Sequence, residues 1–414
     1  MVRINEEYLN LSATYLFIEI ARRSREFQAA NPGAKLLRLG VGNTTEPLTP
    51  AVIAGLHSGV EKLARADTYS GYGDEQGNTA LRERISQVKY QDRGAKIAPD
   101  EIFISDGAKP DTANIQTIFA QDSVVAVQDP AYPVYVDTNV TAGRSGKLLP
   151  SGLYERFVYL PCTEANGFFP DLPDTATLGR KIDIIYFCSP NNPTGAVSSR
   201  AQLQKLVHYA LANDAVIIFD AAYECFIQDS HIPHTIYEIP GARECAIELR
   251  TFSKEAGFTG VRLGWTVVPK NMAADARNPR GLNELWNRRT TTFFNGASNV
   301  AQEGGLAALS ETGRRQNQAT IDLYLGNAAL IREALAELGL TVFGGSDAPY
   351  IWAKTPNGLS SWAFFDKLLN EARVVTTPGA GFGPSGEGFV RFSAFGHRSA
   401  IEEAVSSIRQ NLKL

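Results

Sequence analysis

Three short and almost unbroken apolar runs constrain the fold of this chain more than any other feature. They cover residues 123–128, 183–188 and 215–219, and they are rich in Val, Ile and Phe instead of alternating apolar with polar residues. A strand that is buried on both faces has this pattern, and such a strand belongs to a sheet covered by helices. The runs therefore predict an α/β fold with a largely parallel sheet in the middle of the chain.

The segments around these runs extend the pattern. Residues 76–90 and 202–213 have the apolar spacing of helices, and residues 101–105, 245–251 and 263–268 are expected strands. The tail alternates short strands with helices, which predicts a smaller α/β unit. Its expected helices are residues 321–338, 359–372 and 398–412, and its expected strands are residues 341–343, 350–353, 374–375 and 389–392.

The composition excludes several classes of function. The 414 residues carry 40 Lys and Arg against 44 Asp and Glu, so neither a general nucleic-acid binder nor a protein of anionic membrane surfaces is favoured. Four cysteines without a CxxC and five histidines without an HExxH predict neither a disulfide framework nor a metal site. No apolar run approaches about 20 residues, and the first residues lack the long apolar stretch of a signal peptide. We expect a cytoplasmic enzyme.

Polar and reactive residues follow five of the expected strands, each directly after the strand ends. In open α/β sheets, ligands bind outside the carboxyl ends of the strands. Each segment alone could be an ordinary turn, but five in succession predict one site. The segments are SDGAK at residues 105–109, DPAYP at 129–133, SPNNPTG at 189–195, DAAY at 220–223 and RTFSK at 250–254.

Lys254 is the reactive group that this arrangement favours. A lysine just past a buried strand is partly desolvated, which lowers its pKa and favours the neutral amine that attacks an aldehyde. Arg262 lies eight residues further on and could hold a phosphate with two parallel hydrogen bonds. Taken alone, the same residues could also be a surface lysine and arginine beside a glycine-rich turn.

Together the motifs identify a family. The segment SKEAGFTGVRLGW resembles the lysine signature of fold-type I pyridoxal-phosphate (PLP) aminotransferases, and SPNNPTG and DAAY resemble the two other motifs of that class. Their order and separation also agree, with 28 positions from Asn192 to Asp220 and 34 from Asp220 to Lys254. One departure is Thr251, where the class usually has Gly or Ser. The resemblance implies a PLP-dependent enzyme that transfers amino groups.

The resemblance assigns roles to the residues that match the motifs. Lys254 would bind the cofactor aldehyde and move the substrate proton, Asp220 would pair with the pyridine nitrogen, and Tyr223 and Asn192 would meet the phenolic oxygen. Ordinary alternatives are a helix cap for Asp220 and turn chemistry for Asn192. The other implied cofactor contacts are Ser253, Arg262, Ala108 and Lys109 at the phosphate, with Tyr132 stacked on the ring.

Arg391 is the expected anchor of the substrate. It lies inside the apolar segment FVRFS, where a charged group is costly unless an anion meets it. The family uses an arginine of this C-terminal segment to bind the substrate α-carboxylate. A structural ion pair is the alternative for Arg391.

The likeness narrows further to LL-diaminopimelate aminotransferases. It runs from near residue 3 to the C-terminus through NEEYLNLSATYLF, LRLGVGNTTEPL, TYSGYGDEQGNTALR, SDGAKPD, DPAYPVYVD, FFNGASN and VRFSAFGHR. That family transfers an amino group between glutamate and tetrahydrodipicolinate, giving LL-2,6-diaminopimelate and 2-oxoglutarate on the route to lysine and cell-wall precursors. Tyr72 and Asn295 match groups that reach the cofactor or substrate from the dimer partner or the domain junction. The substrate contacts implied by the resemblance are Tyr15, Gly42, Lys109, Tyr132, Asn192 and Arg391.

Glu75 matches a carboxylate that meets the distal ammonium of diaminopimelate. Its alternative is a carboxylate at a helix N-terminus, stabilised by the helix dipole, and the alternative for Tyr15 is packing between subunits. The family further implies a homodimer with shared active sites. It also implies a large PLP domain at residues 46–296 and a smaller domain built from residues 1–45 and 297–414.

Three other functions stay open or are excluded. A PLP aminotransferase of another acidic or aromatic amino acid, or a PLP lyase, would use the same ring-binding residues. A PLP-binding regulator without turnover usually carries a DNA-binding module, for which 414 residues leave no room. A nicotinamide dehydrogenase is excluded because no GxGxxG follows an expected strand.

Overall fold

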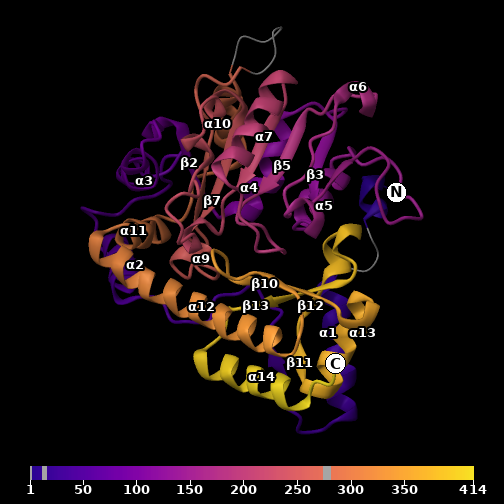
Figure 1. The fold of residues 1–414 in the computed structure, drawn as a ribbon. Coiled ribbons are helices and arrows are strands. Elements are labelled where there is room, and N and C mark those ends of the chain that lie inside the picture. The colour runs from indigo at the N-terminus through magenta and orange to yellow at the C-terminus, as the bar shows by residue number, and fades with distance from the viewer. Residues whose placement is uncertain (1, 12–15, 274–280) are drawn as a thin grey trace.

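A seven-stranded sheet forms the centre of the larger part of the molecule (Figure 1). The computed structural model describes residues 2–11, 16–273 and 281–414. The strand order is β2-β8-β7-β6-β5-β3-β4, and only β8 runs antiparallel to its neighbours. The sheet is therefore mostly parallel, as the sequence predicts. Its strands are β2 Ile102–Ser105, β3 Val125–Asp129, β4 Val158–Pro161, β5 Ile184–Cys188, β6 Val216–Asp220, β7 Ala246–Thr251 and β8 Gly264–Val267.

Both faces of this sheet are buried, which explains the unbroken apolar runs. Along β5, Ile185 and Phe187 pack into one hydrophobic core, whereas Ile184, Tyr186 and Cys188 pack into another on the opposite face. Successive side chains of a strand point to opposite faces, so both sets must be apolar. The helices of this part are α2 Pro50–Leu63, α3 Thr79–Ile85, α4 Ala108–Ile115, α5 Val134–Thr141, α6 Thr175–Leu178, α7 Arg200–Ala212, α8 Ala242–Cys245, α9 Phe252–Glu255, α10 Leu282–Phe293 and α11 Asn299–Ala308.

A four-stranded antiparallel sheet forms the second, smaller unit, with strand order β12-β13-β10-β9. A segment from the N-terminal part and one from the C-terminal part of the chain meet beside it, because β1 pairs in parallel with β11 through Leu37 and Val374. In Figure 1 the sheet lies below the larger one, next to α12, α13 and α14. The elements are α1 Leu16–Ala30, β1 Leu37–Arg38, α12 Glu311–Glu337, β9 Val342–Gly344, β10 Tyr350–Lys354, α13 Ser361–Ala372, β11 Val374–Val375, β12 Thr377–Pro378, β13 Phe389–Ser393 and α14 Arg398–Asn411.

The structure also differs from the expected elements in places. Helix α12 begins ten residues before the predicted start, where Ser310 accepts a hydrogen bond from the amide of Gly313 and caps a polar first turn. The expected helix at residues 76–90 divides into α3 and a π-helical turn, η2 Ser86–Tyr90. In the part of the chain that the structure describes, no helix is long and apolar enough to span a membrane.

Candidate active site

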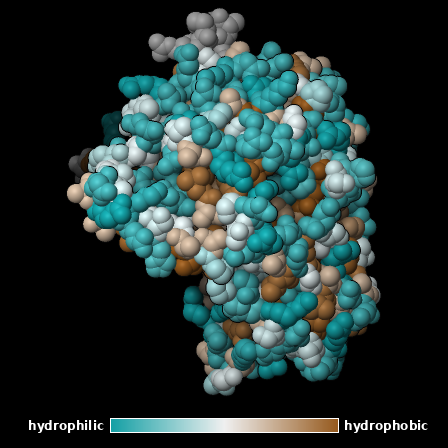
Figure 2. Space-filling view, turned by 90° about the vertical axis from the view of Figure 1, so that its left-hand side faces the viewer, coloured by the Kyte–Doolittle hydropathy of each residue, from teal (hydrophilic) through white to brown (hydrophobic). Residues whose placement is uncertain are grey.

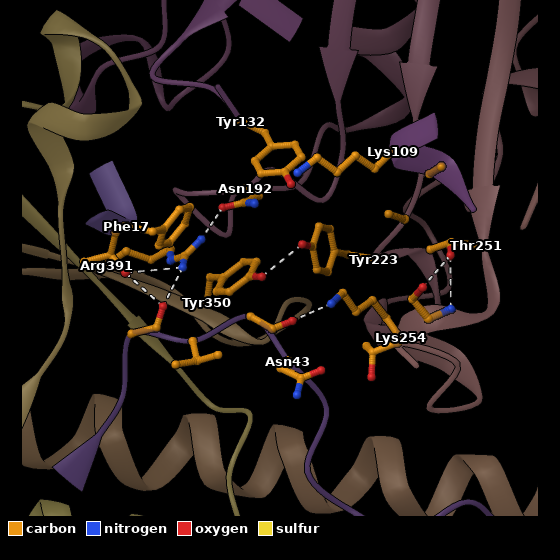
Figure 3. Close-up of a pocket in the computed structure, with 18 of the residues that line it drawn as sticks. Phe17, Asn43, Lys109, Tyr132, Asn192, Tyr223, Thr251, Lys254, Tyr350 and Arg391 are labelled. Carbon is orange, nitrogen blue, oxygen red and sulfur yellow. Dashed lines mark hydrogen bonds between the residues drawn. The ribbon is translucent and has the colours of Figure 1, made fainter. Parts of the chain in front are cut away.

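A cavity of about 630 Å³ opens at the carboxyl ends of β3, β5, β6 and β7, facing the four-stranded sheet. All five polar segments that follow the strands contribute residues to its lining, as the sequence predicts. Figure 3 shows side chains from both sheets pointing into this space. The predicted site residues that line it are Gly42, Ala108, Lys109, Tyr132, Asn192, Asp220, Tyr223, Ser253, Lys254, Arg262 and Arg391.

Lys254 occupies the floor of the cavity on α9, a single helical turn that follows β7. The Thr251 hydroxyl accepts a hydrogen bond of 3.1 Å from the Ser253 amide, so this departure from the family motif caps the turn. The Lys254 ammonium donates to the Gly42 carbonyl oxygen (Figure 3). Burial, with help from the charges of Arg391 and Arg262, lowers the pKa of Lys254 from 10.5 to about 8. A substantial fraction of the amine is therefore neutral near pH 7.5, as a nucleophile or base requires.

Asp220 is the last residue of β6 and faces the same cavity. Its carboxylate accepts a hydrogen bond of 2.7 Å from the Tyr135 hydroxyl and one of 3.0 Å from the Ala222 amide. Burial nevertheless raises the pKa of Asp220 above 3.8. A buried carboxylate held by two donors and open to a cavity can receive a further proton-bearing nitrogen.

An anion cradle lies at the start of α4. The Arg262 guanidinium donates to the Ser253 hydroxyl at 3.2 Å and sits beside Gly107, which precedes the first turn of the helix. Gly107 has φ +121°, and a Cβ there would lie 2.5 Å from Arg262 Nη2, so only glycine fits. Arg262 itself holds the unusual φ of +69°. Free backbone amides, a hydroxyl and a guanidinium together suit a phosphate.

Arg391 is a second anion receptor. It is 2% exposed, and it donates to Asn192 Oδ1 at 2.6 Å and to the Gly40 carbonyl oxygen at 2.8 Å. Its guanidinium lies 4.4 Å from the ring centre of Tyr350 and 4.9 Å from that of Phe382. Among the described residues, no carboxylate forms an ion pair with it. A buried cation without a counter-ion attracts an external carboxylate, which argues against the structural ion pair.

Two predicted aromatic residues, Tyr223 and Tyr132, also line the cavity. Tyr223 follows β6 and shares a hydrogen bond of 2.9 Å with the Tyr350 hydroxyl, while Tyr132 packs edge-on against Tyr135 at 6.0 Å between ring centres. Burial raises the pKa of Tyr132 to about 12 and that of Tyr223 well above 10. Both phenols are therefore neutral and can donate hydrogen bonds at neutral pH.

Three of the predicted residues that the structure describes do not line the cavity. Tyr72 is 86% exposed, and Glu75 and Asn295 are exposed as well. Tyr15 lies outside the described residues. Within this single chain the structure thus brings none of Tyr72, Glu75 and Asn295 to the cavity.

Other lining residues were not predicted from the sequence. Tyr350, Tyr135, Phe17 and Asn43 belong to this group. Tyr350 comes from β10, whose sequence YIWAK has the pattern of an ordinary core strand. Tyr135 lies two residues after the DPAYP segment, so its position in the sequence could have predicted that it lines the cavity.

Comparison with known proteins decides the family. Residues 34–408 match the family model for class I and II aminotransferases. The chain belongs to this family. Aminotransferases of this class depend on PLP, so the predicted cofactor, enzyme class and fold are confirmed.

Named relatives cover the whole chain. A curated protein from Parabacteroides distasonis, named LL-diaminopimelate aminotransferase, is 51% identical over all of both chains. The solved LL-diaminopimelate aminotransferase of Chlamydomonas reinhardtii is 49% identical, with a TM-score of 0.91 over 99% of this chain and 98% of its own. A Thermus thermophilus aspartate aminotransferase mutant shares the fold at 21% identity, with a TM-score of 0.82 over 99% of this chain and 100% of its own.

The cavity of this aminotransferase fits PLP. It offers a phosphate cradle at Ala108, Ser253 and Arg262, a buried carboxylate at Asp220 and the amine of Lys254. The cradle suits the phosphate of the cofactor, the carboxylate suits its pyridine nitrogen, and the amine suits its aldehyde. Arg391 matches none of these parts of the cofactor, so it is available to bind a substrate.

Proposed function

We propose that this aminotransferase exchanges the amino group of LL-2,6-diaminopimelate with 2-oxoglutarate, giving tetrahydrodipicolinate, glutamate and the water released when the product ring closes, in either direction. The observation that carries the chemistry is the meeting of Lys254, Asp220 and the counter-ion-free Arg391 in one cavity. The full-length relative at 51% identity supports the choice of substrate. Lysine and cell-wall precursor biosynthesis would be its setting.

The residues of the chain divide the work as follows. When bound, PLP withdraws electrons from the substrate carbon that loses its proton. Lys254 removes and returns that proton, which a pKa of about 8 allows near neutral pH. Asp220 holds a proton at the pyridine nitrogen, and Tyr223 and Asn192 donate hydrogen bonds to the phenolic oxygen. Ser253, Arg262 and the first amides of α4 hold the phosphate.

Substrate recognition would begin at Arg391, which pairs with the α-carboxylate. Diaminopimelate carries a second amino-acid head, so its far end needs both donors and an acceptor. Lys109 and Tyr132 line the cavity and supply donors, and we propose Tyr15 and Gly42 as further contacts. Glu75 would accept from the distal ammonium.

We further propose a homodimer with shared active sites. Tyr72, Glu75 and Asn295 are exposed here, so they could serve a neighbouring subunit's cavity. Figure 2 faces the side on which α2, α3 and α11 lie in Figure 1, and hydrophobic patches interrupt its hydrophilic surface. Ile53, Val60 and Leu63 are exposed apolar residues of α2, and Tyr69 and Phe293 are exposed close to Tyr72 and Asn295 in the sequence. Contiguous exposed apolar surface is typical of an interface.

The domain division also stays a proposal, with the larger domain at residues 46–296 and the smaller one at 1–45 and 297–414. It is supported by the separate sheets, because the seven strands fall within residues 102–267 and the four strands within residues 342–393. Helix α11 departs from it, because Ala301 and Ala308 pack in the core of the larger sheet although they lie beyond residue 296. The pairing of β1 with β11 joins the N-terminal part of the chain to the C-terminal part. A cytoplasmic location stays a prediction from the sequence.

A half-reaction tests the function. The PLP-loaded protein is mixed separately with LL-diaminopimelate, meso-diaminopimelate, glutamate, aspartate or an aromatic amino acid, without any keto acid, and loss of the visible cofactor absorbance is followed. We expect LL-diaminopimelate and glutamate to cause this loss. Reaction with aspartate or aromatic amino acids but not with LL-diaminopimelate would retain an aminotransferase of another amino acid and reject the proposed substrate.

A further inference from the structure

Tyr350 is a buried tyrosine at the point where the two sheets meet. It lies on β10 of the four-stranded sheet and is 1% exposed. Its hydroxyl is 2.9 Å from the hydroxyl of Tyr223, which follows β6 of the seven-stranded sheet. Figure 3 shows Tyr350 between Arg391 and Tyr223. The hydrogen bond therefore connects the two sheets inside the cavity.

Packing fixes the ring of Tyr350 without help from its hydroxyl. The Arg391 guanidinium lies 4.4 Å from its centre, and the rings of Tyr223 and Phe395 pack edge-on at 5.1 and 6.1 Å. Removal of the hydroxyl alone should leave these contacts in place. The contribution of the hydrogen bond can thus be separated from that of the ring.

Gly42 leaves room for the hydroxyl. A Cβ built on Gly42 would lie 2.7 Å from Tyr350 Oη, and among the described residues that are not its chain neighbours the one further atom within 4 Å is Cζ of the same ring at 3.9 Å. Glycine at this position therefore allows the Tyr350 hydroxyl to stand where it meets Tyr223. The backbone carbonyl of Gly42 also accepts the Lys254 hydrogen bond.

We propose that Tyr350 is a positioning residue that donates its hydrogen bond to the Tyr223 oxygen and so directs the Tyr223 hydrogen into the cavity. Each phenol has a single hydrogen, so in this pair one hydroxyl donates and the other accepts. A hydroxyl that accepts a hydrogen bond becomes a stronger donor. The inference rests on the proposed function, in which Tyr223 donates to the phenolic oxygen of PLP.

The charges around the pair favour this direction. Arg391 stacks directly on Tyr350, and its positive charge opposes the rise that burial causes in the Tyr350 pKa. Burial raises the pKa of Tyr223 well above 10, and Arg391 is the weakest of the causes that act on it there. The more acidic hydroxyl of a pair is the better donor, so Tyr350 gives its hydrogen to Tyr223.

The experiment uses Tyr350→Phe with PLP alone, so no amino-acid substrate is involved. A hydrogen bond from Tyr223 stabilises negative charge on the oxygen it meets, which lowers the pH at which the bound cofactor loses a proton. Loss of the Tyr350 hydroxyl should raise the midpoint of the pH-dependent visible absorbance by about 0.4 to 1 unit, the equivalent of one neutral hydrogen bond. The affinity of the cofactor-free protein for PLP should fall about 2- to 10-fold. The affinity for glutarate, a dicarboxylate without an amino group, should not change because Arg391 keeps its stacked ring.

The matched control is Tyr237→Phe. Tyr237 is also buried, and its hydroxyl donates to the carbonyl oxygens of Ala246 and Val267 at 3.0 and 3.2 Å, outside the cavity lining. This variant should lose stability without moving the absorbance midpoint. Equal midpoints in wild type and Tyr350→Phe, or equal shifts in both variants, would overturn the proposal.

Gly42→Ala gives a second route if Tyr350→Phe folds poorly. The new methyl group should displace the Tyr350 hydroxyl from Tyr223 and raise the absorbance midpoint in the same direction. In the double variant the clash disappears, so its midpoint should match that of Tyr350→Phe alone. Fully additive shifts would contradict the role of the hydroxyl. A wild-type protein that does not bind PLP would instead refute the proposed function itself.

Discussion

The Lys254 amine should cost the folded protein stability, because its pKa is lowered from 10.5 to about 8. At pH 7 this group is protonated in both the folded and the unfolded chain, so the full difference of 2.5 units opposes folding. At 1.36 kcal/mol per unit, the cost is about 3 kcal/mol. Replacement by methionine removes the charge but also the hydrogen bond to Gly42, worth about 1 kcal/mol. We therefore expect Lys254→Met to stabilise the cofactor-free protein by about 2 kcal/mol at pH 7.

The pH dependence gives this prediction its sign. Above pH 10.5 the amine is neutral in both states and the cost is absent, it grows as the pH falls from 10.5 to 8, and it is complete below 8. The stability gained by Lys254→Met should thus be largest at pH 7 and should shrink by more than half at pH 9.5.

Urea denaturation of the cofactor-free proteins at both pH values measures the effect. Lys109→Met is the matched control, since Lys109 lines the same cavity but is exposed, and it should change the free energy of unfolding by no more than about 0.5 kcal/mol. With PLP present, Lys254→Met should lose activity by at least about 10³-fold. A variant that is less stable than wild type at pH 7, or a gain that does not depend on pH, would refute the reasoning.

Three further substitutions test other parts of the molecule. Arg391→Met should raise the KM for amino acids about 10- to 100-fold, because it removes a buried charge-assisted pair with the carboxylate; an unchanged KM in steady-state assays would place the carboxylate elsewhere. Lys89→Met should lower the free energy of unfolding by about 3 kcal/mol or more, because the Lys89 ammonium bridges the buried Glu224 and Glu255 at 2.9 and 2.6 Å. A loss below about 1 kcal/mol in urea denaturation would contradict this. Glu75→Ala should reduce turnover of LL-diaminopimelate more than that of glutamate, and equal losses would remove its proposed role.

The strands of the larger sheet could be predicted because burial on both faces leaves a local trace. In β5 all five side chains had to be apolar or small, and no tertiary information is needed to recognise such a run. The convergence of Asp220 and Lys254 followed from the same logic, since the carboxyl ends of parallel strands share one edge. Their exact roles came from motif resemblance and not from periodicity.

Lys89 shows where a local pattern stops being informative. The spacing of residues 76–90 predicts one helix, and nothing in it separates Lys89 from a solvent-exposed lysine. In the structure the π-helical turn η2 buries Lys89 between Glu224 and Glu255. Both carboxylates lie more than 130 residues further along the chain, so only the packed fold could reveal this pairing.

By itself, the sequence determined the strands of the sheet and the polar segments that follow them, and it predicted Lys254 as the reactive lysine. Each of these is encoded within a single element or a contiguous motif. The tertiary structure alone decided that Arg391 has Asn192 and two aromatic rings for neighbours and that Tyr350 meets Tyr223 across 127 residues. Such contacts depend on how two sheets are placed relative to each other, and the apolar pattern of one strand carries no record of its partner.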